Sequence, residues 1–286
     1  MIVDILLDAL KDSVILIPFL FLTYLLLEAV EAHVSEKMAS TVGTSHWFDP
    51  ILGAVLGVVP ECGFSAAASS LFSGGALTIG TLVAVFLATS DEMLPIFISE
   101  NAPAPFIVKI LCVKVAIAAV VGLLLNVLFA KRNRAARQAA EARIEELCEN
   151  SHCACTEHTG IVKPALIHTG EIVGFVLAVN LVLNTVVALG GSAVLEKMAI
   201  ADPVLACVVT ALIGLVPNCA VSVAITELYL SGVLSAGAML SGLLSGCGVG
   251  MLVLFRTNRH LKENLTILAI TYIAGVLGGL FAGLLF

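Results

Sequence analysis

Long apolar runs, separated by short polar segments, cover almost the whole chain. Each run is long enough to cross about 30 Å of hydrocarbon as an α-helix, which needs roughly 18 or more residues. Backbone groups inside a bilayer must be satisfied within their own segment, so such runs predict helices. The runs occupy residues 13–35, 50–73, 76–98, 105–130, 162–190, 203–230, 234–255 and 264–286. The pattern predicts an all-α polytopic membrane protein.

The composition supports the same class. Hydrophobic residues make up 59% of the 286 positions and charged residues only 12%, too few to cover a water-soluble globule. The first run has no basic segment before it, so we expect a retained helix and not a cleaved signal peptide. We expect membrane lipid as a partner and no nucleic acid. Most of the cysteines lie in apolar surroundings, which argues against an extracellular disulfide framework.

An internal repeat appears when the chain is compared with itself at an offset of 157 residues. Residues 57–87 align with 214–244 without a gap and share eleven identities in 31 positions. Roughly three identities would be expected by chance in so apolar a composition. We therefore divide the chain into a first membrane repeat (1–130), a linker (131–160) and a second membrane repeat (161–286).

Basic residues predict that the two repeats have opposite orientations. Lys and Arg favour the cytoplasmic side of a membrane, and they cluster after residue 130 and in 256–262. The first-repeat equivalent of 256–262 is 99–105, which has no positive charge and belongs outside. Inverted repeats need an odd number of crossings in each half, whereas each half has four apolar runs. One run in each half must therefore turn back.

The runs that contain Pro60 and Pro217 are the best candidates for turning back. Proline lacks an N–H and clashes with the preceding helical turn, and Gly63 allows a sharp change of direction. The two legs beside Pro60 are each about ten residues long, enough for half a membrane. We predict a re-entrant helical hairpin in each repeat; a proline-kinked span is the alternative.

Polar residues gather at these breaks and at a second interruption in the following run. Acids at membrane depth are costly and usually functional, and oxygen and sulfur groups together suit a metal cation. The acids are also candidates for carrying protons. Helix breaks are expected at Pro60, Gly63, Pro217 and Gly246. The candidate ion-binding residues are Glu61, Cys62, Ser65, Thr89, Ser90, Asp91, Glu92, Asn218, Cys219, Ser222 and Cys247.

For the acids Asp91 and Glu92, and for Lys114, the sequence is compatible with more than one role. Asp91 and Glu92 are also placed to cap a helix start near the membrane interface. Lys114 lies inside an apolar run, so its ammonium needs a carboxylate partner or a water-filled face, and the sequence does not show which.

The linker carries a dense group of metal-binding residue types. Its spacing matches no standard zinc finger, but Cys/His-rich tracts bind zinc, copper or related ions. A flexible linker without metal is the alternative. The group consists of Cys148, His152, Cys153, Cys155 and His158.

These motifs resemble one known family, the ten-helix heavy-metal exporters of prokaryotes, described as arsenic-efflux proteins or manganese transporters. The likeness covers nearly the whole chain and is carried by the segments 59–63, 88–95, 216–219 and 148–158. Six spans and four half-helices would make ten segments. The resemblance implies a multi-pass protein of the prokaryotic cytoplasmic membrane. It does not choose between a metal and an oxyanion.

The sequence favours a secondary transporter that exports a divalent or heavy-metal cation, manganese-like, in exchange for protons or sodium. No phosphate-binding Gly-x4-Gly-Lys-Ser/Thr motif is present for direct use of ATP. The alternative is export of an anion held at the N-termini of the hairpin helices. We expect no enzymatic activity and no cofactor other than a transported metal ion. Monomer and homodimer both remain open.

Overall fold

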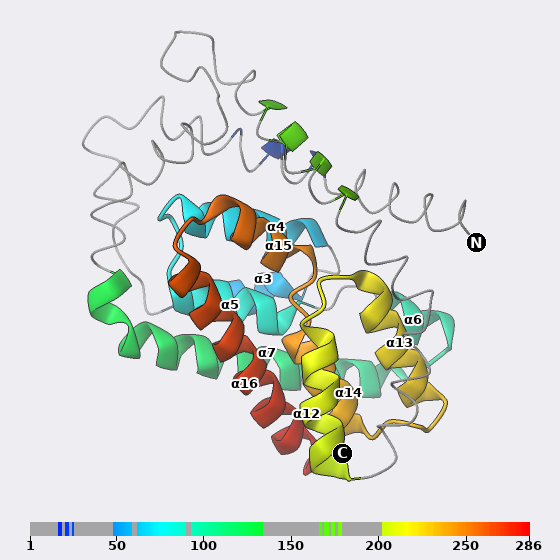
Figure 1. Cartoon of the computed structure of the whole chain (residues 1–286). Helices are drawn as coiled ribbons and strands as arrows, with labels where there is room; N and C mark the ends of the chain where they lie inside the picture. Colours follow the sequence, from blue (N-terminus) through cyan, green and yellow to red (C-terminus); the bar gives the residue numbers. More distant parts are fainter. Residues whose placement is uncertain are drawn as a thin grey trace, which may run out of the picture.

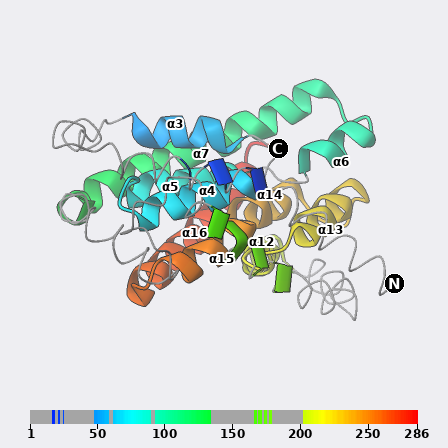
Figure 2. The same cartoon turned by 90° about the horizontal axis from the view of Figure 1, so that it is seen from above.

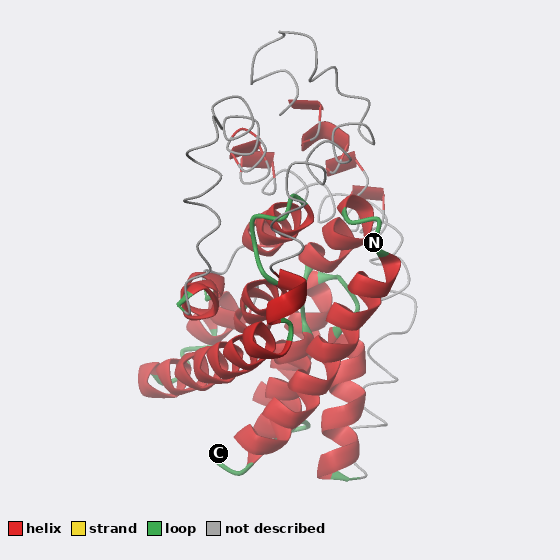
Figure 3. Ribbon diagram, turned by 90° about the vertical axis from the view of Figure 1, so that its left-hand side faces the viewer, coloured by secondary structure: helices red, strands yellow, loops and turns green. Residues whose placement is uncertain are grey.

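The apolar runs form helices joined by short loops (Figure 1). The computed structural model describes residues 48–58, 62–89, 93–133 and 202–286, with isolated positions between 17 and 25 and between 166 and 178. Figure 3 shows helices and loops, without strands, in this part of the chain. The first repeat contributes α3 (Asp49–Gly57), α4 (Cys62–Ser73), α5 (Ile79–Ala88), α6 (Met93–Ser99) and α7 (Ala104–Leu128). The second contributes α12 (Pro203–Gly214), α13 (Cys219–Leu230), α14 (Ala236–Ser245), α15 (Val249–Thr257) and α16 (Leu261–Gly283).

Two helices of the first repeat, α4 and α5, begin and end at residues equivalent to those of α13 and α14 in the second. Thr78 caps α5 by accepting a hydrogen bond from the backbone N–H of Thr81, at 3.2 Å, and Ser235 caps α14 in the same way. Gly75 and Gly232, also 157 residues apart, have φ angles of +79° and +77° in the turns before these helices. Only glycine adopts such angles without strain, so the repeat in sequence is a repeat in local structure.

Four segments among the described residues are long and apolar enough to cross a membrane: Ile79–Ser99, Ala104–Leu128, Ala236–Thr257 and Leu261–Gly283. The first and third are interrupted helices, α5 with α6 and α14 with α15. Their apolar windows are 73% and 83% buried, against 22% for α7, so the interrupted segments form the centre of the molecule. α7 exposes apolar side chains that suit contact with lipid, including Val120 and Leu124.

The chain reverses direction between α12 and α13. A Cβ atom added at Gly242 of α14 would lie 3.1 Å from the carbonyl oxygen of Thr210 in α12 and 2.7 Å from Ile225 in α13. Fifteen residues of continuous helix would separate these two residues by about 22 Å. Thr210 and Ile225 are therefore much closer together than in a continuous helix, and the chain changes direction sharply between α12 and α13.

A helix of each repeat, α4 in the first and α13 in the second, packs against the other repeat. Ser69 of α4 donates a hydrogen bond to the carbonyl oxygen of Gly250 in α15, at 2.7 Å, and Ser73 bonds to Thr257 at 2.7 Å. Reciprocally, the ring of Tyr229 in α13 forms a T-shaped contact with the ring of Phe97 in α6. Figures 1 and 2 show α6 beside α13, away from α4 and α15. The core is therefore built from crossed contributions of both halves.

Equivalent loops lie at opposite ends of α16. Near its start, the Glu263 carboxylate pairs with Arg132, which follows α7, at 3.0 Å. Just beyond its other end, Lys109 of α7, close to the 100–103 loop, donates a hydrogen bond to the carbonyl oxygen of Leu285 at 2.8 Å. A helix of this length spans about 34 Å. The basic loop 256–262 and its equivalent in the first repeat, the loop 99–105 without positive charge, are therefore far apart.

Glycine pairs set the close approach of the long helices. Gly80 faces Gly122 between α5 and α7, and the equivalent Gly237 faces Gly279 between α14 and α16. A Cβ atom at Gly279 would lie 2.7 Å from the carbonyl oxygen of Gly237, closer than real Cβ atoms approach. Small residues of this kind let membrane helices pack backbone to backbone.

We predict that Gly279→Ala destabilises the protein by about 1–3 kcal/mol, because the backbones of α14 and α16 must separate. Gly283→Ala, one turn further along α16, is the control: its nearest neighbour would be 3.5 Å away. Thermal unfolding in lipid nanodiscs measures both variants. Equal melting temperatures for the two would contradict this account of the packing.

Candidate functional site

Both interrupted helices stop in the interior of the molecule. α5 ends with Thr89 as its C-terminal cap, and α14 ends with Gly246 at the equivalent position. After Gly246 the backbone turns through Gly248, which has a φ angle of +53°, before α15 begins at Val249. Glycine is needed at this turn because other residues rarely adopt such an angle. Thr89 is 4% exposed, so the C-terminal end of α5 lies within the protein.

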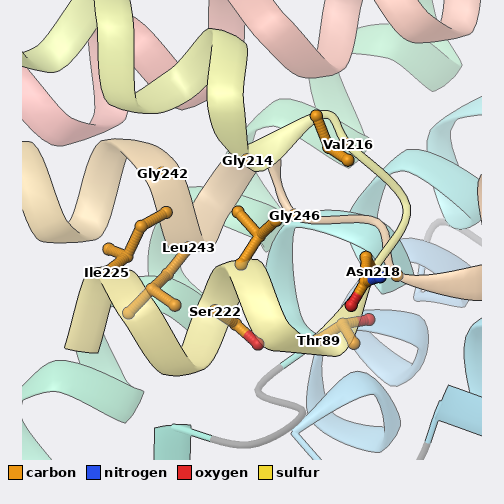
Figure 4. Close-up of a pocket in the computed structure, with 11 residues that line it drawn as sticks. Thr89, Gly214, Val216, Asn218, Ser222, Ile225, Gly242, Leu243 and Gly246 are labelled. Carbon is orange, nitrogen blue, oxygen red and sulfur yellow. The ribbon is translucent and has the colours of Figure 1, made fainter. Parts of the chain in front are cut away.

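A small cavity lies where the ends of α5 and α14 meet the turn between α12 and α13. The cavity has a volume of about 20 Å³, enough for about one water molecule. Figure 4 shows the polar residues Thr89, Asn218 and Ser222 on one part of its wall and the apolar Ile225 and Leu243 on another. The remaining lining residues are Gly214, Val216, Val221, Gly242, Gly246 and Gly248.

Several predicted site residues come together at this cavity. Thr89, Asn218 and Ser222 line it, as does the predicted helix-break residue Gly246. Thr89 comes from the first repeat and the other three from the second, so both halves contribute. Pro217 lies in the turn directly before Asn218, between α12 and α13.

Two predicted site residues lie elsewhere. Ser65 is fully buried on α4, and its side chain lies against the backbone of Gly250 in α15. Cys247 is buried, and its thiol donates a hydrogen bond to the carbonyl oxygen of Ser245 at 3.2 Å. Neither residue lines the cavity. Gly63 is buried in the first turn of α4.

The other predicted residues are described in part or not at all. Cys62 and Cys219 begin α4 and α13, but their side chains are outside the described set. The remaining ones, Pro60, Glu61, Ser90, Asp91, Glu92, Cys148, His152, Cys153, Cys155 and His158, lie outside the described residues. Within the described ranges, no group of three or more His, Cys, Asp or Glu residues is placed to hold a metal.

Lys114 reaches the same breaks from the middle of α7. It is fully buried, and its ammonium donates hydrogen bonds to the carbonyl oxygen of Thr89 and, at 3.3 Å, to that of Leu243. Both acceptor residues line the cavity, one in each repeat. The sequence marks Lys114 as unusual for its apolar setting but cannot show that the carbonyl oxygens of Thr89 and Leu243 accept bonds from it, because every residue has such an oxygen.

These features define an all-helical, multi-pass membrane protein with helix breaks around an internal polar cavity. The chain belongs to the family described as "Putative, 10TM heavy-metal exporter", whose model matches residues 1–196. The family resemblance in the sequence is thereby confirmed, and it makes the chain a member of a transporter family for metal efflux. No curated protein and no solved structure matches the chain.

We predict that Ser222→Leu abolishes transport while the protein still folds, because a larger apolar side chain replaces a hydroxyl on the cavity wall. Ser231→Leu is the matched control, since Ser231 is exposed at the end of α13. Transport into proteoliposomes and thermal unfolding should be measured for both. Normal transport by Ser222→Leu would show that the cavity is not on the transport path.

Proposed function

We propose that the protein is a secondary transporter that exports a divalent or heavy-metal cation across the cytoplasmic membrane, in exchange for protons or sodium. The observation that carries this proposal is the cavity at which the helix breaks of both repeats meet. In transporters built from repeats, substrates and coupling ions bind at such interrupted helices near the middle of the bilayer.

The proposed membrane arrangement is two inverted repeats with hairpins that enter from opposite faces. It is supported by the separation of the equivalent loops along α16, by the reciprocal packing of α4 on α15 and α13 on α6, and by the basic residues of 256–262. On the positive-inside rule, the end of the molecule that contains Arg132 and Glu263 is cytoplasmic. The linker at 131–160 would then be cytoplasmic as well.

The internal repeat indicates where the charge for cation binding comes from. Two residues that line the cavity, Asn218 and Gly248, correspond at the 157-residue offset to Glu61 and Asp91. If Glu61 and Asp91 occupy positions in the first repeat equivalent to those of Asn218 and Gly248, their carboxylates lie at the helix breaks. Carboxylate, amide and hydroxyl oxygens suit hard cations such as manganese, and nearby thiols favour softer metals.

Anion export is the second candidate. α13 and α15 both begin at the cavity, and helix N-termini carry partial positive charge and free N–H groups that bind anions. The three acids expected at the first break, Glu61, Asp91 and Glu92, would oppose an anion, and for this reason we favour the cation.

We also propose that the linker residues 148–158 take up or sense metal on the cytoplasmic face. The support is the density of thiol and imidazole groups in this segment, which are ligands for zinc and copper. This role is separate from the membrane site.

We predict that Glu61→Gln and Asp91→Asn each reduce metal export by at least tenfold without preventing folding, because each removes a negative charge from the proposed site. Glu227→Gln is the control, since Glu227 is exposed on α13. Uptake into inverted vesicles should be compared for Mn²⁺, Zn²⁺, Co²⁺, Ni²⁺, Cu²⁺ and Cd²⁺, with arsenite and phosphate as contrasts.

Export of a metal by the parent chain and its loss in both acid variants would support the proposal. Undiminished export in both variants would remove the acids from the site. Transport of phosphate or arsenite without any metal would favour the anion alternative.

A further inference from the structure

Lys114 places a charged group inside an apolar helix. Its side chain is fully buried in the middle of α7, where a charged group is costly unless it is paired or has a function. Its ammonium bonds to carbonyl oxygens of both repeats, Thr89 in the first and Leu243 in the second. These bonds join two chain segments that are 154 residues apart in the sequence.

Both acceptors lie at the C-terminal ends of interrupted helices. The last four carbonyl groups of any helix lack a partner within it, and the end of the helix carries a partial negative charge. Thr89 is the C-terminal cap of α5, and Leu243 lies in the last turn of α14. Inside a membrane such carbonyls need a donor or a cation, since no bulk water is present.

In transporters with interrupted helices, C-terminal ends and unwound carbonyls of this kind commonly coordinate a monovalent cation. Here the ammonium of Lys114 meets them. An ammonium group carries one positive charge and three donors, so it can satisfy two carbonyl groups from different helices at once.

The second repeat has no such group at the equivalent position. Thr271 lies 157 residues after Lys114, on α16, and its hydroxyl bonds to the carbonyl oxygen of Ile267 within the same helix, at 2.8 Å. The second repeat therefore accommodates a small neutral side chain at the equivalent position. The lysine is a feature of the first repeat alone and not a requirement of the helix packing.

We propose that the ammonium of Lys114 takes the place of a bound monovalent cation at the meeting point of the two interrupted helices. The chain thus carries its own cation at a position where other transporters bind one from solution. It follows that no sodium ion is needed at this point, whichever substrate is exported. This inference goes beyond the proposed function and does not depend on the identity of the exported ion.

The test is to remove the ammonium and supply a cation from solution. Lys114→Ala, purified into lipid nanodiscs, should melt at a lower temperature than the parent chain. NH₄⁺, methylammonium or Na⁺ is then substituted for choline in the buffer, so that the ionic strength stays constant. Each of these cations should raise the melting temperature of the variant by a few degrees, because a ligand that binds only the folded state stabilises it. The parent chain should show no such dependence.

Three further variants keep the test decisive. Lys114→Thr copies the second repeat and serves if the alanine variant does not fold; it should respond to the same cations. Lys114→Met fills the space with an apolar chain and should not respond. Lys109→Ala removes an exposed lysine of α7 that also bonds to a carbonyl oxygen, that of Leu285, and should not respond.

Stabilisation by small cations in the alanine or threonine variant, absent from the methionine and Lys109 variants, would support the proposal. A lack of response in both, or an equal response in the parent chain, would overturn it. No exported metal is present in this experiment, so its failure would leave the proposed function untouched, and a failure of metal export would leave this inference untouched.

Discussion

A backbone interrupted inside hydrocarbon must find partners for its free N–H and C=O groups, and the architecture follows from that requirement. α5 and α14 both stop within the protein, at Thr89 and Gly246. Each half covers the interrupted segment of the other, with α4 against α15 and α13 against α6. Lys114 then satisfies carbonyl groups of both interrupted helices. Side chains of both repeats therefore contact the interrupted segments.

The same requirement explains why the functional residues gather at the breaks. An interrupted helix places polar backbone groups inside a largely apolar interior, and an ion that leaves water needs such surroundings. The cavity lined by Thr89, Asn218 and Ser222 is small and joins both repeats, so a change in the packing of either half would alter it. This geometry suits alternating access, in which one half moves against the other around a shared site.

Much of the helical arrangement could be predicted from the sequence. The apolar runs mark the helices, the 157-residue repeat marks their equivalence, and Pro217 with its neighbours marks the reversal between α12 and α13. Composition and spacing cannot show which helices meet across the repeats. For this reason Ser65 and Cys247 were expected at the site but lie beside it. The two carbonyl oxygens that accept bonds from Lys114 are backbone atoms, which have no sequence signature.

The central claim is that the repeats are inverted, so that equivalent loops face opposite sides of the membrane. It is tested most directly by placing a cysteine at Glu100 and, separately, at His260, which are exposed in equivalent loops. A membrane-impermeant maleimide is applied to right-side-out and inverted vesicles, with the parent chain as the baseline. The account predicts that Glu100→Cys reacts from outside and His260→Cys from the cytoplasmic side. Reaction of both from the same side would contradict it.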